Sequence, residues 1–441
     1  MTPTPATVRR TYYVLTAGNT LAASLIWGIN TIFLLDAGLS NLEAFAANAF
    51  FTAGMVLFEI PTGIVADSWG RRASFLCGTI TLAVTTALYV LLWQVRASFA
   101  WWAIVSALLG LGFTFFSGAT EAWLVDALTA TGFDGMLERV FSRAQVIAGI
   151  TMLTGSVAGG YIAQLTNLGV PYVVRAAILI VVFILALIMM HDIGFTPQRG
   201  GRPLAEMRTI LRNSIDSGLR VPPVRALMLA GFFTGGVEIY VFYALQPYLL
   251  QLWGNPHAYG IAGLVAALVA GAGIIGGLLA PVFRRLFHRR TSALLIMQSV
   301  AVGMLALIGL IHNFWAVIAF ILVWGLVYAA AHPIRQAYLN GLIPSQQRAT
   351  ILSFDSLMGS AGGIVAQPAL GRSADVWSYP ISYVISAGWA ALSLPFLFRA
   401  RQMKMAADAE AAPGETETPP ANTAPTDTPP ADTPTADQPS K

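Results

Sequence analysis

The chain has 441 residues, of which 56% are hydrophobic and only 10% are charged. A soluble domain of this size normally carries about a quarter charged residues, so the composition excludes an ordinary soluble domain and indicates a membrane protein. The formal net charge of +4 does not indicate nucleic-acid binding, because the arginines concentrate in short loops between hydrophobic stretches.

Twelve hydrophobic stretches are long enough to cross a bilayer. A crossing needs about 20 mostly apolar residues, since the hydrocarbon core is about 30 Å thick and a helix rises about 1.5 Å per residue. Their apolarity is continuous rather than alternating, which favours helices, so we expect an all-α membrane protein. The predicted helices span residues 13–35, 44–66, 73–95, 100–127, 142–165, 172–191, 224–250, 258–283, 291–311, 314–340, 351–374 and 379–399.

The loops between these helices differ strongly in arginine content. Loops on the side of the N-terminus hold Arg9, Arg10, Arg71 and many more, whereas the opposite loops hold only Arg96 and Arg372. The positive-inside rule therefore places both termini in the cytoplasm. We expect a multi-pass protein of the cell inner (plasma) membrane.

Two stretches are expected to lie outside the membrane. Residues 192–222 are basic and partly amphipathic, typical of a linker that contacts anionic membrane lipids. Residues 402–441 are rich in Ala, Pro, Thr and acids, which predicts a disordered cytoplasmic tail, so removal of 405–441 should leave activity intact. The expected domains are a six-helix half over 1–191, the linker 192–222, a second six-helix half over 223–401 and the tail.

Three short motifs recur in the same order in both halves. GIVADSWGR at 63–71 aligns with GLLAPVFRR at 277–285, EAWL at 121–124 with QAYL at 336–339, and GSVAGGYIAQ from 155 with GSAGGIVAQ from 359. The separations are close to half of the hydrophobic region. They predict two pseudo-symmetric six-helix halves related by an axis along the membrane normal.

With these repeats and the loop GIVADSWGRR, the chain resembles the major facilitator superfamily over about residues 10–400. That loop is similar to the family's signature between its second and third helices, and GSVAGG resembles a motif of its antiporters, with Ser156 where that motif has proline. The resemblance implies the fold of that superfamily and transport like that of drug/proton antiporters. The positions that match the signature are Gly63, Asp67, Gly70, Arg71 and Arg72.

The signature loop is expected to act as a cytoplasmic gate. Asp126 lies at the inner end of the fourth predicted helix, where an arginine of the loop could reach it and form a latch between opposite charges. The resemblance implies that the five signature residues and Asp126 favour an outward-facing state. A simple positive-inside anchor would explain the arginines but neither Asp67 nor the glycines.

Ionisable and polar residues within the predicted helices are the candidate proton and substrate sites, because each is costly in a bilayer unless it is paired or faces water. Glu238 is the first candidate, with Tyr243 and Gln246 nearby; a structural carboxylate is the alternative. Glu121 could face a cavity or form a salt bridge between helices. Asn30 could line a pore or hold helices together.

The tenth predicted helix carries an aromatic and basic stripe. Trp324, Tyr328 and Arg335 fall within about 40° of one another at helical spacing. The stripe could bind a planar or anionic substrate, or Arg335 could pair with an acid across the cavity. Asp355 could cap its own helix or pair with Arg348.

Together these patterns predict a proton-coupled secondary active transporter that works by alternating access and exports small amphipathic organic compounds or drugs. An importer of a small nutrient or organic anion and a non-transporting receptor on the same fold are the alternatives. The sequence has no P-loop, GxSxG motif or metal-spaced His/Cys cluster, so no enzyme, cofactor or metal site is expected. The expected partners are a small-molecule substrate, protons and membrane lipids, without nucleic acid, for a monomeric chain.

Overall fold

The computed structural model describes residues 4–197, 220–343 and 348–408, which are almost wholly helical. The first half comprises α1 Pro5–Trp27, α2 Asn30–Asp36, α3 Asn41–Trp69, α4 Arg71–Gln94, α5 Phe99–Thr114, α6 Ala119–Ala130, α7 Leu137–Leu165 and α8 Gly169–Met189. The second half comprises α10 Pro222–Trp253, α11 Tyr259–Arg285, α12 Arg290–Leu310, α13 Phe314–Leu342, α14 Arg348–Val376, α15 Tyr379–Ala391 and α16 Leu394–Gln402, followed by the 3₁₀ turn η2 Ala406–Asp408.

Each predicted crossing corresponds to one helix or to a broken pair of helices. Ten helical segments of the described chain are long and apolar enough to span a membrane, and the pair α1 and α2, bent by 50°, makes an eleventh. The remaining predicted crossing corresponds to α14, which is not among these apolar segments; it has 29 residues and packs between α3 and α10. The predicted all-α membrane fold is confirmed.

Three crossings are interrupted, which the continuous hydrophobic pattern did not predict. α1 ends at Trp27 and α2 begins at Asn30. α5 and α6 are separated by a turn in which Gly118 adopts a left-handed backbone with φ of 67°. α15 gives way to α16 at Leu392 and Ser393. A break in a crossing is tolerated where neighbouring helices bury the freed backbone groups.

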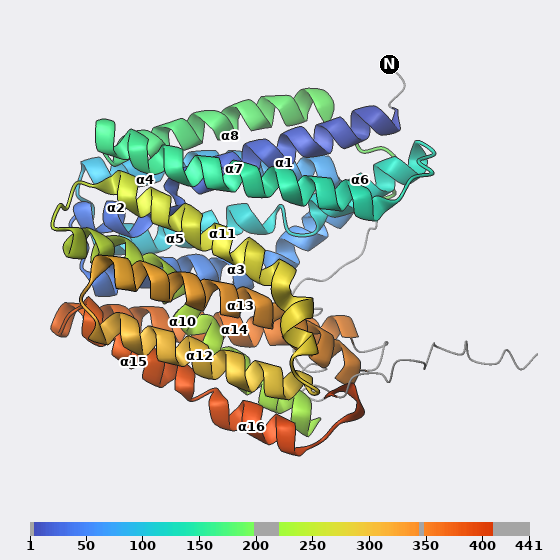
Figure 1. Cartoon of the computed structure of the whole chain (residues 1–441). Helices are drawn as coiled ribbons and strands as arrows, with labels where there is room; N and C mark the ends of the chain where they lie inside the picture. Colours follow the sequence, from blue (N-terminus) through green and yellow to red (C-terminus); the bar gives the residue numbers. More distant parts are fainter. Residues whose placement is uncertain (1–3, 198–219, 344–347, 409–441) are drawn as a thin grey trace, which may run out of the picture.

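The two halves pack against each other mainly along two helix pairs. Figure 1 shows most helices of the first half, coloured blue to green, above most of those of the second half, coloured lime to red, while the yellow helix α11 of the second half overlaps the first half in this view. The halves meet where α3 packs on α14 and where α7 packs on α11. The sequence repeats relate α3 to α11 and α7 to α14, so these two contacts are equivalent under the pseudo-two-fold axis.

The segments at the domain boundaries are only partly described. Residues 198–219, which include most of the expected amphipathic linker, and residues 409–441 lie outside the described residues. The start of the expected tail is instead part of the fold. Asp408 is 1% exposed and accepts hydrogen bonds from the backbone N–H and the hydroxyl of Thr291, both at 2.7 Å, near the start of α12. The folded chain therefore extends at least to Asp408.

Candidate functional site

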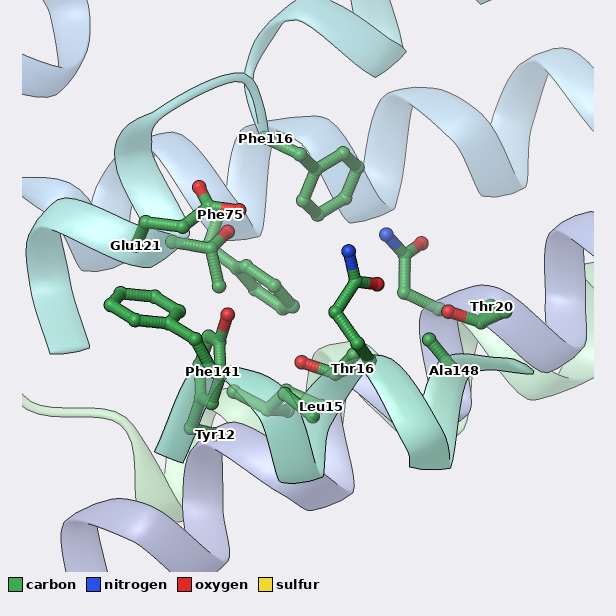
Figure 2. Close-up of a pocket in the computed structure, with 13 residues that line it drawn as sticks. Tyr12, Leu15, Thr16, Thr20, Phe75, Phe116, Glu121, Phe141 and Ala148 are labelled. Atoms are coloured by element: carbon green, nitrogen blue, oxygen red, sulfur yellow. The ribbon is translucent and has the colours of Figure 1, made fainter. Parts of the chain in front are cut away.

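A cavity of about 290 Å³ lies within the first half, between α1, α4, α6 and α7. Figure 2 shows Glu121 and the rings of Phe75 and Phe141 gathered around it. Most of its lining comes from the middle of α1 and from the first parts of α4 and α7, which start on the side of the N-terminus. The lining residues are Tyr12, Leu15, Thr16, Asn19, Thr20, Phe75, Phe116, Thr120, Glu121, Phe141, Ala144, Gln145 and Ala148.

The break between α5 and α6 positions the acid of this cavity. The turn at Gly118 restarts the helix, so Glu121 stands in the first turn of α6, where a carboxylate is favoured by the helix dipole. The side chain is exposed, and Phe116, from the turn itself, lines the same cavity. Glu121 is therefore placed in the cavity wall, among aromatic rings and hydroxyl and amide groups.

A second group of predicted residues meets in the other half. The Tyr328 hydroxyl of α13 donates a hydrogen bond to Glu238 Oε2 of α10. Trp324 stacks on Tyr328 with ring centroids 5.4 Å apart and planes 18° apart. A smaller cavity of about 70 Å³ beside Tyr328 is lined also by Thr234 and Arg335. Glu238, Tyr328 and Trp324 thus form one cluster.

Arg335 is paired with an acid in this structure. Its Nη1 and Nη2 atoms each lie 2.6 Å from a different oxygen of Asp355, and Nη2 also donates to the Leu227 carbonyl at 3.0 Å. The bidentate geometry and the burial of Asp355, which is 7% exposed, fix this pair. Of the alternatives for Arg335, the structure has the pair with an acid, and the partner of Asp355 is Arg335 rather than Arg348.

Two further candidates, Gln246, expected near Glu238, and Asn30, expected to line a pore or hold helices together, make hydrogen bonds at the end of the bundle opposite to the N-terminus. Gln246 of the second half accepts from the Thr31 backbone N–H at 3.0 Å and donates to the Trp27 carbonyl at 2.7 Å in the first half. Asn30 accepts from the Tyr172 hydroxyl at 3.0 Å and donates to Asn48 at 3.1 Å. Gln246 therefore links the halves where the first crossing is broken.

Further contacts join the halves at this same end. The Asp375 carboxylate, at the end of α14, accepts from the backbone N–H groups of Asn41 and Leu42, at 2.9 and 2.8 Å. A Cβ added to Gly263 of α11 would lie 2.5 Å from the Ser156 carbonyl of α7, so glycine permits the close approach of these helices. This end of the bundle is closed.

The signature loop lies at the opposite end, and its side chains bond to groups of the first half. Arg71 forms an ion pair of 2.7 Å with Asp67, four residues earlier. Arg72 donates from Nη2 to the Leu187 carbonyl at 2.7 Å, and its backbone N–H donates to Asp192 at 2.9 Å. Gly70, with φ of 109°, turns the chain from α3 into α4.

The expected contact between this loop and Asp126 is replaced by another. The acid that meets the start of α4 is Asp192, which follows α8, and a Cβ on Gly70 would lie 2.4 Å from its carboxylate. The backbone carbonyl of Asp126 instead packs beside Gly194, where an added Cβ would lie 2.9 Å away. Gly63 has open space around its Cα within the described residues. Asp192 was missed because the sequence alone does not show that the ends of α3 and α8 meet.

Arg175 of α8 is a second residue that the sequence analysis missed. It is 2% exposed, and its Nε and Nη2 atoms have no hydrogen-bond partner among the residues that the structure describes. Its Cζ lies 6.0 Å from the centre of the Phe113 ring. Tyr243, one of the predicted site residues, is among its electrostatic neighbours. A single arginine within an otherwise apolar run was the signal available in the sequence.

Comparisons with known proteins agree with this architecture. The family model described as Major Facilitator Superfamily matches residues 12–310 and, in a second match, residues 227–429. A protein of Bacillus subtilis (strain 168), named uncharacterized MFS-type transporter YxaM, is 23% identical over 85% of this chain and 92% of its own length.

Solved structures are similar in fold at low sequence identity. The nucleoside transporter NupG superposes with a TM-score of 0.71 at 10% identity, over 90% of this chain and 99% of NupG. A bacterial homolog of the human lysosomal transporter Spinster, in an inward-facing and unoccupied conformation, gives a TM-score of 0.66 at 16% identity, over 93% of this chain and 100% of that one.

Proposed function

Because the chain belongs to the major facilitator superfamily of membrane transporters, we propose that it is a proton-coupled secondary transporter that exports small amphipathic organic compounds by alternating access. The observation that carries the proposal is the cavity of about 290 Å³ in the first half, with Glu121 in its wall. A pocket with a few polar groups among aromatic side chains is the usual form of a small-molecule site.

The asymmetry between the two ends supports alternating access. Hydrogen bonds from Gln246 and Asp375 hold the halves together at one end. The cavity lies toward the other end, which carries the N-terminus and the signature loop. If the arginine-rich loops face the cytoplasm, this arrangement corresponds to an inward-facing state, in which a compound enters from the cytoplasm before export.

The lining favours an amphipathic compound. Phe75, Phe116 and Phe141 offer aromatic faces, while Asn19 and Gln145 offer amide groups. The Glu121 carboxylate would attract a cationic or hydrogen-bond-donating group, and the rings would pack against an apolar or planar body.

Glu238 is the proposed proton carrier. It stands in the second half, away from the lining of the larger cavity, and accepts a hydrogen bond from Tyr328. A charged carboxylate within the membrane is energetically unfavourable. Glu238 can therefore bind a proton in one state of the carrier and accept the Tyr328 hydrogen bond in the other. Because the proton site and the substrate site are separate, a bound proton and a bound substrate can each shift the same conformational equilibrium.

The test uses inverted membrane vesicles that contain the protein. An amphipathic fluorescent cation such as ethidium should accumulate when the vesicle interior is acidified, and vesicles without the protein should not accumulate it. An importer coupled in the same direction as protons would instead release preloaded compound under this gradient. Counterflow without a gradient identifies a carrier, since a channel does not accelerate exchange and a receptor moves nothing. Indifference to the pH gradient would exclude proton coupling.

A further inference from the structure

Arg175 places a positive charge inside the membrane part of the first half. It is the seventh residue of α8, about 9 Å along the helix axis from its first residue. Arginine keeps its charge in proteins, and a charged side chain within a bilayer is retained where it meets a partner, water or a ligand. At 2% exposure the side chain of Arg175 is withdrawn from solvent.

The surroundings of Arg175 stabilise a cation but do not neutralise it. The Phe113 ring offers a cation–π contact, with the ring centre 6.0 Å from Cζ. In residues 4–197, 220–343 and 348–408, its electrostatic neighbours are the tyrosines Tyr89, Tyr172 and Tyr243 rather than acids. Two of these hydroxyls bond elsewhere, Tyr89 with Ser106 at 2.6 Å and Tyr172 to Asn30 at 3.0 Å.

The two nitrogens of Arg175 without partners lie on one edge of the guanidinium. Nε and Nη2 are both buried, and both lack a hydrogen-bond acceptor within the described part of the chain. Their N–H groups point in parallel, at the spacing that matches the two oxygens of a carboxylate. Two adjacent unpaired donors on one buried cation define the chemistry of the missing partner, which is a small anion that can accept from both donors.

We propose that Arg175 is an anion-binding site, which takes the carboxylate of an organic compound or an inorganic monoanion. The ring of Phe113 and the tyrosines suit a planar apolar body attached to the carboxylate. The inference rests on the proposed transport function and extends it, because the carrier would then also recognise anionic groups. Its test measures binding and does not require transport.

The position of Tyr243 explains how an anion reaches so buried a site. Tyr243 belongs to α10, in the second half, and Arg175 to the first. Near Tyr243 the halves also touch through Trp27 and Phe242, whose ring centroids are 5.6 Å apart. Separation of the halves at this end uncovers Arg175, so the site is accessible in the state that is open there and enclosed in the present one.

Equilibrium binding of radiolabelled benzoate and, separately, radiolabelled chloride to the purified full-length protein tests the proposal. We expect saturable binding of at least one of them, weakened at least tenfold in Arg175→Gln. Arg175→Lys keeps the charge but loses the planar fork, so binding should weaken at least threefold. Arg372→Gln, which removes an exposed arginine, is the matched control and should bind as the unaltered protein does.

The two labels distinguish the sources of the anion. Saturable binding of benzoate that chloride does not displace assigns the site to organic carboxylates, and saturable binding of chloride that benzoate does not displace assigns it to inorganic monoanions. If neither anion binds saturably, or if a folded Arg175→Gln variant binds as tightly as the unaltered protein, the proposal is wrong. Arg175→Lys provides the comparison where Arg175→Gln does not fold. A failure of vesicle transport leaves these binding results unaffected, so the two proposals fail separately.

Discussion

Asp375 completes the first turn of a helix that belongs to the other half of the protein. At the start of α3, Ser40 and Glu43 form a capping box that satisfies the N–H groups of Glu43 and Ser40. The N–H groups of Asn41 and Leu42 remain, and the Asp375 carboxylate accepts from both. Helix caps usually come from adjacent residues, so this one exists only while the halves are together.

Asp375→Ala should therefore shift the protein toward the state that is open at this end. The lost hydrogen bonds are exposed, and a net loss of about 1.4 kcal/mol would move the equilibrium about tenfold. Spin-label distances across the ends of α3 and α14 measure the two populations. Glu43→Gln, which alters the cap within the first half alone, is the control. Unchanged distances in Asp375→Ala would show that the cap does not hold the halves together.

Glycines along α11 should differ sharply in their tolerance of a side chain. A Cβ at Gly263 would lie 2.5 Å from the Ser156 carbonyl, whereas at Gly277 it meets nothing within 4 Å. Gly263→Ala should prevent closure of α7 on α11 and reduce transport at least tenfold. Gly277→Ala should change transport less than twofold, since alanine only favours the helix. Equal rates for the two variants would contradict a closing surface at Gly263.

The ion pair of Asp67 and Arg71 should control conformational change rather than binding. The side chains are 49% and 21% exposed, so the pair contributes only about 0–1 kcal/mol to stability. Asp67→Asn or Arg71→Ala should lower transport about tenfold while ethidium affinity stays within about twofold, because neither residue lines the cavity. Loss of affinity with normal turnover would assign the loop to the substrate site instead.

The end of the chain should show a sharp boundary in a truncation series. Removal of 409–441 should leave the unfolding temperature unchanged, as the composition of that segment predicts. Removal of 405–441 also deletes Asp408, whose carboxylate binds the N–H of Thr291. A lost cap of about 1–2 kcal/mol should lower the unfolding temperature by several degrees. Asp408→Ala should reproduce that decrease, and a tolerated 405–441 deletion would contradict it.

The fold could be predicted from the sequence because each segment that crosses the lipid must be apolar and about 20 residues long. Apolar runs of about 20 residues give the helices, and the repeat of GIVADSWGR as GLLAPVFRR gives the two halves. The breaks at Gly28 and Gly118 were not predictable from hydropathy, because neighbouring helices decide whether freed backbone groups are satisfied.

The partners of charged residues were harder to predict than their positions. Arg335 was found from helical spacing, but its choice of Asp355 depends on how α13 and α14 pack. Asp375 and Asn41 are separated by 334 positions in the chain. Glu238 and Tyr328 were both expected in the site, yet only the packing of α10 and α13 joins them by a hydrogen bond.

The hydrogen bond between Glu238 and Tyr328 gives the sharpest prediction for proton coupling. Glu238→Gln keeps the size of the side chain but cannot carry a proton, so accumulation driven by a pH gradient should fall to the level without a gradient. Exchange of compound for compound should stay within about twofold, because it needs only reorientation of the loaded carrier. Both activities are measured in the same vesicles, and Glu138→Gln, at an exposed position early in α7, is the matched control.

Glu121→Gln separates the two acids by the same pair of assays. Glu121 lines the cavity, so its loss should weaken ethidium binding and lower accumulation and exchange together. Glu238 accepts from Tyr328 in the other half, so only its replacement should uncouple the two activities. If Glu121→Gln abolishes accumulation and spares exchange, the proton is carried by the cavity acid itself. Substrate and proton would then compete for one carboxylate in the first half, and the cluster of Glu238, Tyr328 and Trp324 would serve packing alone.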